Sequence, residues 1–145
     1  MDVIERDGIV NIDNLLLEAK IARKNAYVPY SSFSVGAALL GDNGTIYRGC
    51  NIENSSFSMT NCAERTAFFN AVSGGVHKFK ALAVTGDTEG PISPCGACRQ
   101  VMAEFCDGDM PVYLTNLKGD VLETTVAKLL PGAFNKEDID YGKKQ

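Results

Sequence analysis

The sequence has little of several features that mark common classes of protein. Its 145 residues include one histidine, and 14 Lys and Arg stand against 18 Asp and Glu, which gives a net charge of −4. A protein dedicated to nucleic acid normally carries a basic stripe, so we expect no nucleic-acid partner. No apolar run approaches the ~20 residues of a membrane-spanning helix, and no signal-peptide pattern precedes Asp2 and Glu5. We therefore expect no membrane segment.

The chain has no sign of a disulfide-rich scaffold, with five cysteines in all. An odd number does not suit a framework of disulfides, and free thiolates suit a reducing compartment, so we expect the protein to be cytoplasmic. Cys50 and Cys106 are expected to behave as small buried apolar side chains. Two short motifs contain the other three cysteines, Cys62, Cys95 and Cys98, and predict a chemical role for them.

The first motif is Cys-Ala-Glu at residues 62–64, and the second is Pro-Cys-Gly-Ala-Cys at 94–98. Three thiolates can hold one zinc ion and leave its fourth tetrahedral position open, as in catalytic zinc sites. A structural site would need a fourth ligand, and His77 lies in a polar stretch without a motif. Glu64 follows the first ligand at a distance of two residues and is the candidate group for proton transfer from a zinc-bound water. A structural zinc or a redox pair remains the alternative interpretation of the second motif alone.

The hydrophobic periodicity predicts alternating strands and helices. We expect helices over residues 13–27, with an apolar stripe, over 62–72 with Asn61 as N-cap, from Pro94 to about residue 106, and briefly after Thr125. We expect strands over 33–39, 45–51, 81–85, 112–115 and 121–124. This order predicts a single α/β domain over residues 1–145, built as a three-layer α-β-α sandwich with a mixed five-stranded sheet. The three thiols then lie at helix N-termini, which favour thiolates.

Several separated motifs carry a resemblance that covers nearly the whole chain. They are Pro-Tyr-Ser at 29–31 with Phe-Ser-Val-Gly-Ala at 33–37, Asn-Ile-Glu-Asn at 51–54, Cys-Ala-Glu-Arg at 62–65, Pro-Cys-Gly-Ala-Cys-Arg-Gln at 94–100 and Leu-Leu-Pro-Gly-Ala-Phe at 129–134. With these motifs the chain resembles the cytidine deaminases, in particular the small homotetrameric kind with three cysteines. The resemblance implies hydrolytic deamination of cytidine or deoxycytidine, one Zn²⁺ per chain, and a homotetramer with shared active sites.

The resemblance also implies roles for residues around the zinc. Glu64 would take the proton from water, protonate ring N3 and carry a proton to the departing amino group. Arg65 would hydrogen-bond the ligand thiolates and offset their charge, which exceeds that of Zn²⁺ by one. Backbone groups near Ala63 and Ser93 would bind the edge of the base.

Further residues would hold the nucleoside. Asn51 and Glu53 stand two apart and so on one face of an extended segment, where an amide and a carboxylate can bind a sugar hydroxyl; the resemblance assigns them the 3′-hydroxyl. Phe33 would pack against the pyrimidine, and Phe134 would stack on it from a neighbouring subunit. Ser55 and Phe57 stand where relatives commonly have Ala and Tyr, in a loop that reaches a neighbouring site.

Three other functions compete with this interpretation. A deaminase of a cytosine-containing antibiotic such as blasticidin S would share the three cysteines and Glu64, but the Asn51–Glu53 pair favours a plain nucleoside sugar. A polynucleotide deaminase would need a basic surface for the phosphate backbone. A zinc-stabilised interaction module would bind zinc without turnover.

Overall fold

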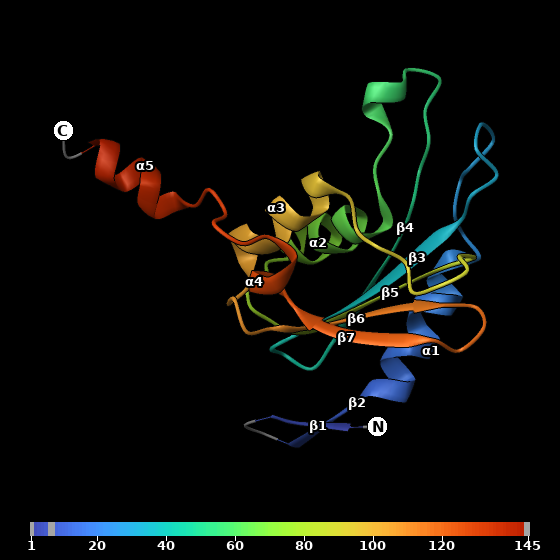
Figure 1. The fold of residues 1–145 in the computed structure, drawn as a ribbon, viewed down its shortest axis with the longest axis horizontal. Coiled ribbons are helices and arrows are strands. Elements are labelled where there is room, and N and C mark those ends of the chain that lie inside the picture. The colour runs from blue at the N-terminus through green and yellow to red at the C-terminus, as the bar shows by residue number, and fades with distance from the viewer. Residues whose placement is uncertain (1, 6–7, 144–145) are drawn as a thin grey trace.

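A mixed five-stranded sheet forms the centre of the molecule (Figure 1). The computed structural model describes residues 2–5 and 8–143. The strands are β3 (Val35–Gly41), β4 (Ile46–Cys50), β5 (Phe79–Gly86), β6 (Pro111–Asn116) and β7 (Val121–Thr125), in the order β4-β3-β5-β6-β7. Only β5 and β6 pair in parallel; the other neighbours in this sheet are antiparallel. The expected mixed sheet of five strands is confirmed.

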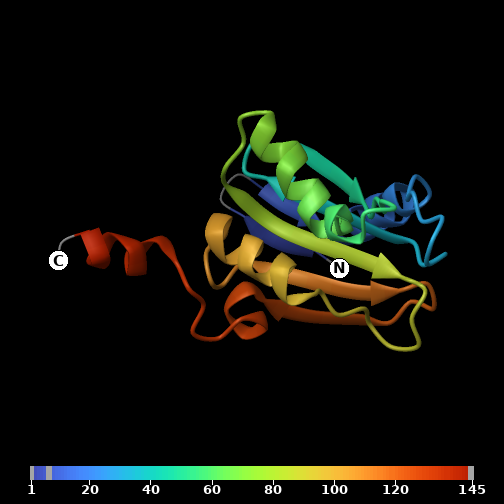
Figure 2. The same cartoon turned by 90° about the horizontal axis from the view of Figure 1, so that it is seen from above.

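Helices cover both faces of this sheet (Figure 2). Helix α1 (Ile12–Arg23) lies on one face, and α2 (Ala63–Ser73), α3 (Gly96–Phe105) and the short α4 (Val126–Leu129) lie on the other. The buried side chains form two clusters, one on each face of the sheet. One joins α1 to alternate residues of β3 and β5, and the other joins α2 and α3 to the residues between them. The three-layer sandwich expected from the sequence is therefore present.

Two glycines set how closely the helices approach the sheet. A Cβ atom at Gly36 of β3 would lie 2.1 Å from the carbonyl oxygen of Ala19 in α1. A Cβ atom at Gly49 of β4 would lie 2.3 Å from the carbonyl oxygen of Ala63 and 2.4 Å from the nitrogen of Ala67, both in α2. No side chain fits at such distances, so glycine allows the backbones to touch. At Gly49 the helix held in this way is the one that follows Cys62.

The structure corrects two details of the sequence prediction. The first helix ends at Arg23 rather than Tyr27, because the backbone of Tyr27 pairs with the segment after β4: its N–H donates to Asn51 and its carbonyl accepts from Glu53. The N-cap of α2 is Cys62 rather than Asn61, whose side chain instead donates to the hydroxyl of Thr66. The backbone of Asn61 also pairs with Ile52 in both directions, so tertiary pairing overrides local propensity at both places.

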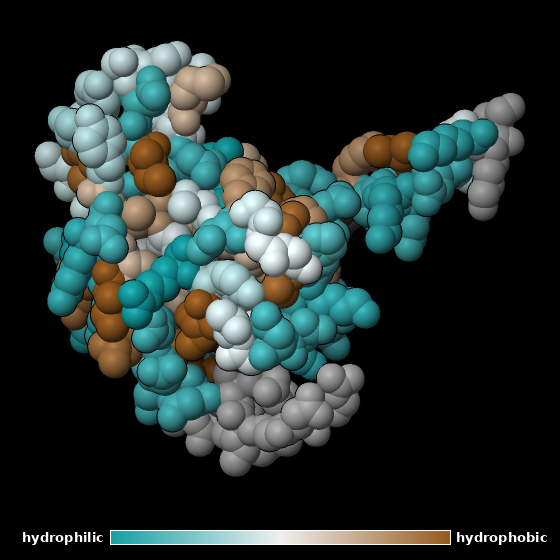
Figure 3. Space-filling model, turned by 180° about the vertical axis from the view of Figure 1, so that it is seen from behind, coloured by the Kyte–Doolittle hydropathy of each residue, from teal (hydrophilic) through white to brown (hydrophobic). Residues whose placement is uncertain are grey.

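Three elements were not expected from the sequence. They are an N-terminal hairpin of β1 (Asp2–Glu5) and β2 (Gly8–Asn11), a 3₁₀ turn η1 (Phe57–Met59), and α5 (Lys136–Lys143). Helix α5 projects away from the body, and the segment that contains η1 rises above the sheet as a long loop (Figure 1). Seen from behind, apolar side chains form small separate groups among polar ones (Figure 3). None of the helices in the described part of the chain is long and apolar enough to cross a membrane.

Candidate metal centre and active site

The three motif cysteines meet at one point on the α2–α3 side of the sheet. The sulfur atoms of Cys62, Cys95 and Cys98 all lie within 4.8 Å of one another. The Sγ atoms of Cys62 and Cys95 are 3.7 Å apart, and those of Cys95 and Cys98 are 3.4 Å apart. Segments more than 30 residues apart in the sequence thus supply the ligands of one small site.

Helix N-termini place these sulfurs. Cys62 and Cys95 are the N-caps of α2 and α3, and Cys98 lies in the first turn of α3, where its N–H donates to the Cys95 sulfur at 3.4 Å. The free backbone N–H groups and the positive end of a helix stabilise thiolates at such positions. The expectation that all three lie at helix N-termini is confirmed.

Arg65 supplies a positive charge to the cluster. Its Nη2 donates to the Cys62 sulfur at 3.4 Å. A hydrogen bond from the Cys98 thiol, together with those from Arg65 and Cys95, lowers the pKa of Cys62 to about 5. The same interaction with Cys62, together with burial, raises the pKa of Cys98 above that of a free thiol. The close approach of the two sulfurs therefore opposes the ionisation of both thiols at once.

This arrangement fits a zinc ion. The cluster offers three soft sulfur donors, and two of them, those of Cys62 and Cys95, also line a pocket from which a fourth ligand can approach. This matches a catalytic zinc site. A divalent cation would remove the conflict between Cys62 and Cys98, because it stabilises all three thiolates at once. Arg65 then offsets the remaining negative charge, as the charge count predicted.

Glu64 is buried beside this group. Its side chain is 5% exposed, and burial, with a smaller contribution from the charge of Cys62, raises the pKa of its carboxyl group to about 7. A carboxyl group whose pKa lies near neutrality can both accept and donate a proton at physiological pH. Its position in the first turn of α2, two residues after Cys62, places the carboxyl group next to the cluster.

A pocket of about 360 Å³ opens over the thiol cluster, and this volume suits a small organic ligand such as a nucleoside. Its wall combines apolar side chains with a few polar ones: Phe33, Val35, Asn51, Cys62, Ala63, Glu64, Thr88, Ile92, Ser93 and Cys95. The pocket brings together Phe33, Asn51, Ala63 and Glu64 with two of the predicted zinc ligands. Sequence reasoning had singled out Ser93 for its backbone, and it also lines the wall.

Asn51 and Glu53 both hold the loop that carries Phe33. The amide of Asn51 accepts from the N–H of Val35 at 2.9 Å and donates to the carbonyl of Phe33 at 2.7 Å. The carboxylate of Glu53 accepts from the N–H groups of Tyr30 and Ser31 and from the Ser31 hydroxyl, and these bonds lower its pKa. Asn51 lines the pocket, and Glu53 does not. A role for the pair in binding sugar stays a prediction.

Three other predicted site residues do not line this pocket. Phe134 is 59% exposed, Phe57 is 74% exposed and packs edge-on against Tyr30, and Ser55 lies in the projecting loop. Within the described part of the chain, no contact brings them to the thiol cluster. Their predicted partner was a neighbouring subunit, so this placement leaves the prediction untested.

Sequence reasoning missed three wall residues. Val35 could have been found, because it lies two positions after Phe33 in an extended segment and so shares its face. Thr88 and Ile92 lie in the irregular connection between β5 and α3, for which no periodicity exists. Cys50 and Cys106 are only partly buried, rather than buried as the sequence predicted, and burial, with the charge of Asp107, raises the pKa of Cys106 to about 12.

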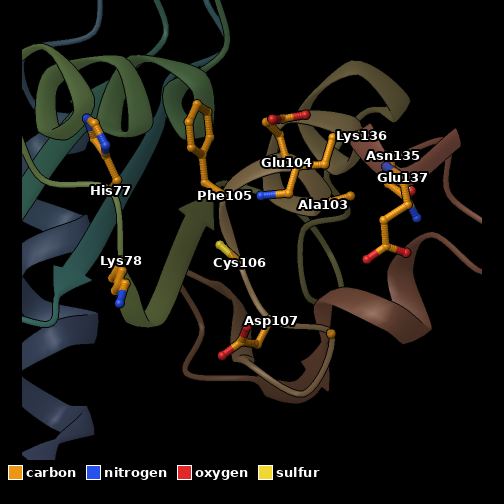
Figure 4. A pocket seen from close by; sticks show the side chains of 11 residues that line it. His77, Lys78, Ala103, Glu104, Phe105, Cys106, Asp107, Asn135, Lys136 and Glu137 are labelled. Atoms are coloured by element: carbon orange, nitrogen blue, oxygen red, sulfur yellow. The ribbon is translucent and has the colours of Figure 1, made fainter. Parts of the chain in front are cut away.

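A larger pocket lies elsewhere and has a different character (Figure 4). It measures about 670 Å³ and lies between the segment at His77, the end of α3 and the start of α5. Charged side chains of both signs, including Lys78, Glu104 and Asp107, point into it from separate walls. Among the described residues, the one group able to hold a metal is the thiol cluster. Chemistry rather than size therefore identifies the smaller pocket as the candidate active site.

The sandwich and the site together define a class of protein, the zinc-dependent deaminases. The family model for the cytidine and deoxycytidylate deaminase zinc-binding region matches residues 10–114. A cytidine deaminase of Sporosarcina psychrophila is 73% identical over 136 residues, which cover 94% of this chain and all of that protein. A cytidine deaminase of Halalkalibacterium halodurans is 60% identical over 126 residues, which cover 87% of this chain and 96% of that protein. This chain belongs to the cytidine and deoxycytidylate deaminase family.

Solved structures agree with this assignment. The crystal structure of cytidine deaminase from Burkholderia pseudomallei superposes with a TM-score of 0.84 at 51% identity, over 86% of this chain and 100% of that one. The crystal structure of cytidine deaminase from Mycobacterium tuberculosis gives a TM-score of 0.75 at 37% identity, over 86% of this chain and 98% of that one. The fold and the family resemblance inferred from the sequence are confirmed.

Proposed function

We propose that this protein hydrolyses cytidine and deoxycytidine to uridine and deoxyuridine with release of ammonia. One observation carries the proposal: a buried carboxyl group, Glu64, lies beside a cluster of three thiols on the floor of a nucleoside-sized pocket. The relatives named above are cytidine deaminases, which favours a plain nucleoside over an antibiotic such as blasticidin S as the substrate.

Cys62, Cys95 and Cys98 hold the zinc ion, and Arg65 hydrogen-bonds the first of these ligands. Bound zinc supplies Lewis acidity, which makes water acidic enough to react near neutral pH. The apolar side chains of Phe33, Val35 and Ile92 limit access of bulk water and offer flat contact to a pyrimidine ring.

Glu64 performs the proton transfers. Its carboxylate accepts a proton from the attacking water while the oxygen forms a bond to C4 of the base, and the resulting acid donates a proton to ring N3. The carboxylate then takes the proton of the new hydroxyl group on C4 and passes it to the amino group, so the bond from C4 to nitrogen breaks, ammonia leaves and the C4 carbonyl of uridine forms. A pKa of about 7 makes both protonation states accessible during this cycle.

Asn51 and Glu53 bind the 3′-hydroxyl of the sugar. Asn51 lines the pocket and, after its two internal hydrogen bonds, retains one N–H and one lone pair. Glu53 keeps lone pairs beyond the three bonds it accepts and follows Asn51 on the same side of the segment. Both residues thus combine a structural task with free hydrogen-bonding capacity.

The active assembly is a cytoplasmic homotetramer with shared active sites. Phe134 and Phe57 are large aromatic side chains that stay mostly exposed in the single chain, and the projecting loop that carries Ser55 and Phe57 extends beyond the body (Figure 1). Such side chains are typical of interfaces. Free thiols at the metal site suit a reducing compartment, which supports the cytoplasm as the location.

A direct assay tests the proposed reaction. Purified protein with zinc is mixed with cytidine, and the fall in ultraviolet absorbance is followed as uridine forms. Metal analysis of the same sample should give about one zinc per chain, because the described residues offer one set of three thiolates. A zinc-loaded sample that leaves cytidine, deoxycytidine and blasticidin S unchanged would contradict a deaminase. Turnover of blasticidin S alone would select the alternative substrate.

A further inference from the structure

The irregular connection from residue 87 to residue 95 forms one wall of the substrate pocket. It links the end of β5 to the start of α3 and contributes Thr88, Ile92, Ser93 and Cys95 to the pocket. It contains no helix or strand, and within it the Thr88 hydroxyl donates to the carbonyl of Gly90. A connection of this kind needs support from outside to keep one shape. We call it the wall segment.

Asn116 supports the first half of the wall segment. This last residue of β6 is 0% exposed. Its Nδ2 donates to the carbonyls of Thr88 at 3.1 Å and Glu89 at 2.9 Å, and to the carboxylate of Asp120 at 2.8 Å. Its Oδ1 accepts from the N–H groups of Lys118 and Asp120, each at 3.0 Å. One buried amide therefore ties the wall segment to the turn between β6 and β7.

Arg99 supports the second half from α3. Its Nε donates to the carbonyl of Pro94 at 2.9 Å and its Nη2 to the hydroxyl of Ser93 at 2.8 Å. Its Nη1 donates to the carbonyl of Leu129, at the end of α4, also at 2.8 Å. A planar guanidinium fixes the relative positions of all three acceptors, which a lysine cannot do.

The backbone adds a third support between the two side chains, since the N–H of Ile92 donates to the carbonyl of Thr115 at 3.1 Å. Neither Asn116 nor Arg99 lines the pocket, yet together they hold the residues on both sides of Ile92. The shape of this wall is therefore set by contacts outside the site. Loss of a wall contact that is made equally with the bound substrate and with the transition state raises KM and leaves kcat nearly unchanged.

We propose that Asn116 and Arg99 are positioning residues that shape the pocket wall for the pyrimidine nucleoside without touching it. The inference rests on the proposed function for the identity of the ligand. It predicts that loss of either side chain raises KM more than it lowers kcat. The zinc content and the fold of the sandwich are kept. A purely structural role would instead lower stability and leave KM unchanged.

Asn116→Asp separates the two roles. Aspartate has the same size and can still accept from Lys118 and Asp120, but it cannot donate to Thr88 and Glu89. Asp120→Ala is the matched control, because it disturbs the turn while Asn116 keeps both bonds to the wall segment. In Asn116→Asp the new carboxylate faces that of Asp120 and repels it. The double variant N116D/D120N removes this repulsion and restores a hydrogen bond inside the turn, but it still lacks the hydrogen bonds to Thr88 and Glu89.

We expect Asn116→Asp and N116D/D120N to raise KM for cytidine about tenfold with a smaller change in kcat, and Asp120→Ala to change KM less than about twofold. Arg99→Lys should resemble Asn116→Asp. Zinc per chain should equal that of the wild type in all four. If Asp120→Ala raises KM as much as Asn116→Asp, or if Asn116→Asp leaves KM within about twofold, the inference is overturned.

Amide hydrogen exchange gives a readout that does not depend on the reaction. The amide of Ile92, which donates to the carbonyl of Thr115, should exchange at least about fivefold faster in Asn116→Asp than in the wild type or Asp120→Ala, because the wall segment opens locally. Unchanged exchange there would overturn the inference even in an inactive protein. If exchange is faster in Asn116→Asp than in the wild type, but the wild type fails to deaminate cytidine, the support of the wall stands and only the proposed function is contradicted.

Discussion

Glu64 lies in an environment that few carboxyl groups occupy. It is buried at the first turn of a helix and beside a thiol cluster, and burial raises its pKa to about 7. Burial of an ionisable group lowers stability unless charge partners or hydrogen bonds compensate, and perturbed pKa values of this kind gather at functional sites. The same carboxyl group can therefore serve several proton transfers at neutral pH.

Glu64→Gln should abolish most turnover without loss of the fold or of zinc. Glutamine has nearly the same shape, but its amide cannot take up and release protons. We expect kcat to fall by ~10²–10⁴-fold, with about one zinc per chain still present by metal analysis. Glu104→Gln, an exposed position on α3, is the control and should keep wild-type kcat. Retention of more than about a tenth of kcat in Glu64→Gln would assign proton transfer to another group.

Asn51 and Glu53 lead to a prediction about the sugar. A site built to hydrogen-bond a hydroxyl leaves buried polar groups unpaired when that hydroxyl is absent. We expect kcat/KM for 3′-deoxycytidine to fall at least about tenfold relative to cytidine, while 2′-deoxycytidine stays within a few-fold. Steady-state kinetics with the three nucleosides measures this. Equal use of 3′-deoxycytidine would leave the pair with only its observed task, the support of the Phe33 loop.

At the scale of the element, the contact between α2 and β4 decides where the first zinc ligand lies. Helix α2 touches the backbone of β4 at Gly49, where a Cβ atom would lie 2.3 Å from the Ala63 oxygen. Since Ala63 directly follows Cys62, any outward shift of the helix would move the Cys62 sulfur away from Cys95 and Cys98. A strand residue without ligand or substrate contact thus sets the metal geometry.

Gly49→Ala should damage stability and zinc binding together. The added methyl group meets rigid backbone rather than a flexible side chain, so we expect the free energy of unfolding to fall by about 3 kcal/mol, measured by urea denaturation, and zinc per chain to drop. Gly142→Ala in α5 is the matched control, because a Cβ atom there meets nothing within 4 Å. A Gly49→Ala protein with normal stability and a full complement of zinc would contradict the close contact.

At the scale of the whole molecule, the single chain leaves several aromatic side chains without cover. Phe134 follows Pro131 and Gly132, and its carbonyl accepts a hydrogen bond from the side chain of Gln100 at 2.7 Å. This bond fastens the backbone of Phe134 to α3 while the ring stays 59% exposed. A fixed backbone with an exposed ring is the arrangement expected for an aromatic side chain that serves a neighbouring subunit.

Phe134→Ala should weaken the use of cytidine without unfolding the chain. Stacking of a base on an aromatic ring contributes ~1–3 kcal/mol, so kcat/KM should fall by roughly five- to a hundredfold. Tyr141→Ala, another exposed aromatic position, should have no effect. Light scattering on the active wild type should give the mass of four chains. A fully active monomer would contradict shared sites, whatever Phe134→Ala does.

The sequence by itself determined the layers, the metal ligands and the family. The continuous apolar run of β5 follows directly from burial on two faces, and the spacing of Cys95 and Cys98 is a local property of one helix turn. Such features depend on residues close together in the chain. For this reason they could be predicted without knowledge of the tertiary structure, as could the placement of Glu64 beside the first ligand.

Tertiary structure alone decided the features that depend on distant partners. The first helix ends at Arg23 because Tyr27 pairs with Asn51, and Cys62 caps α2 in place of Asn61. Burial raises the pKa of Glu64, and no sequence pattern states which side chains will surround it. The wall segment takes its shape from Asn116 and Arg99, which belong to other elements. These contacts join residues far apart in the chain, so only the folded backbone brings them within hydrogen-bonding distance.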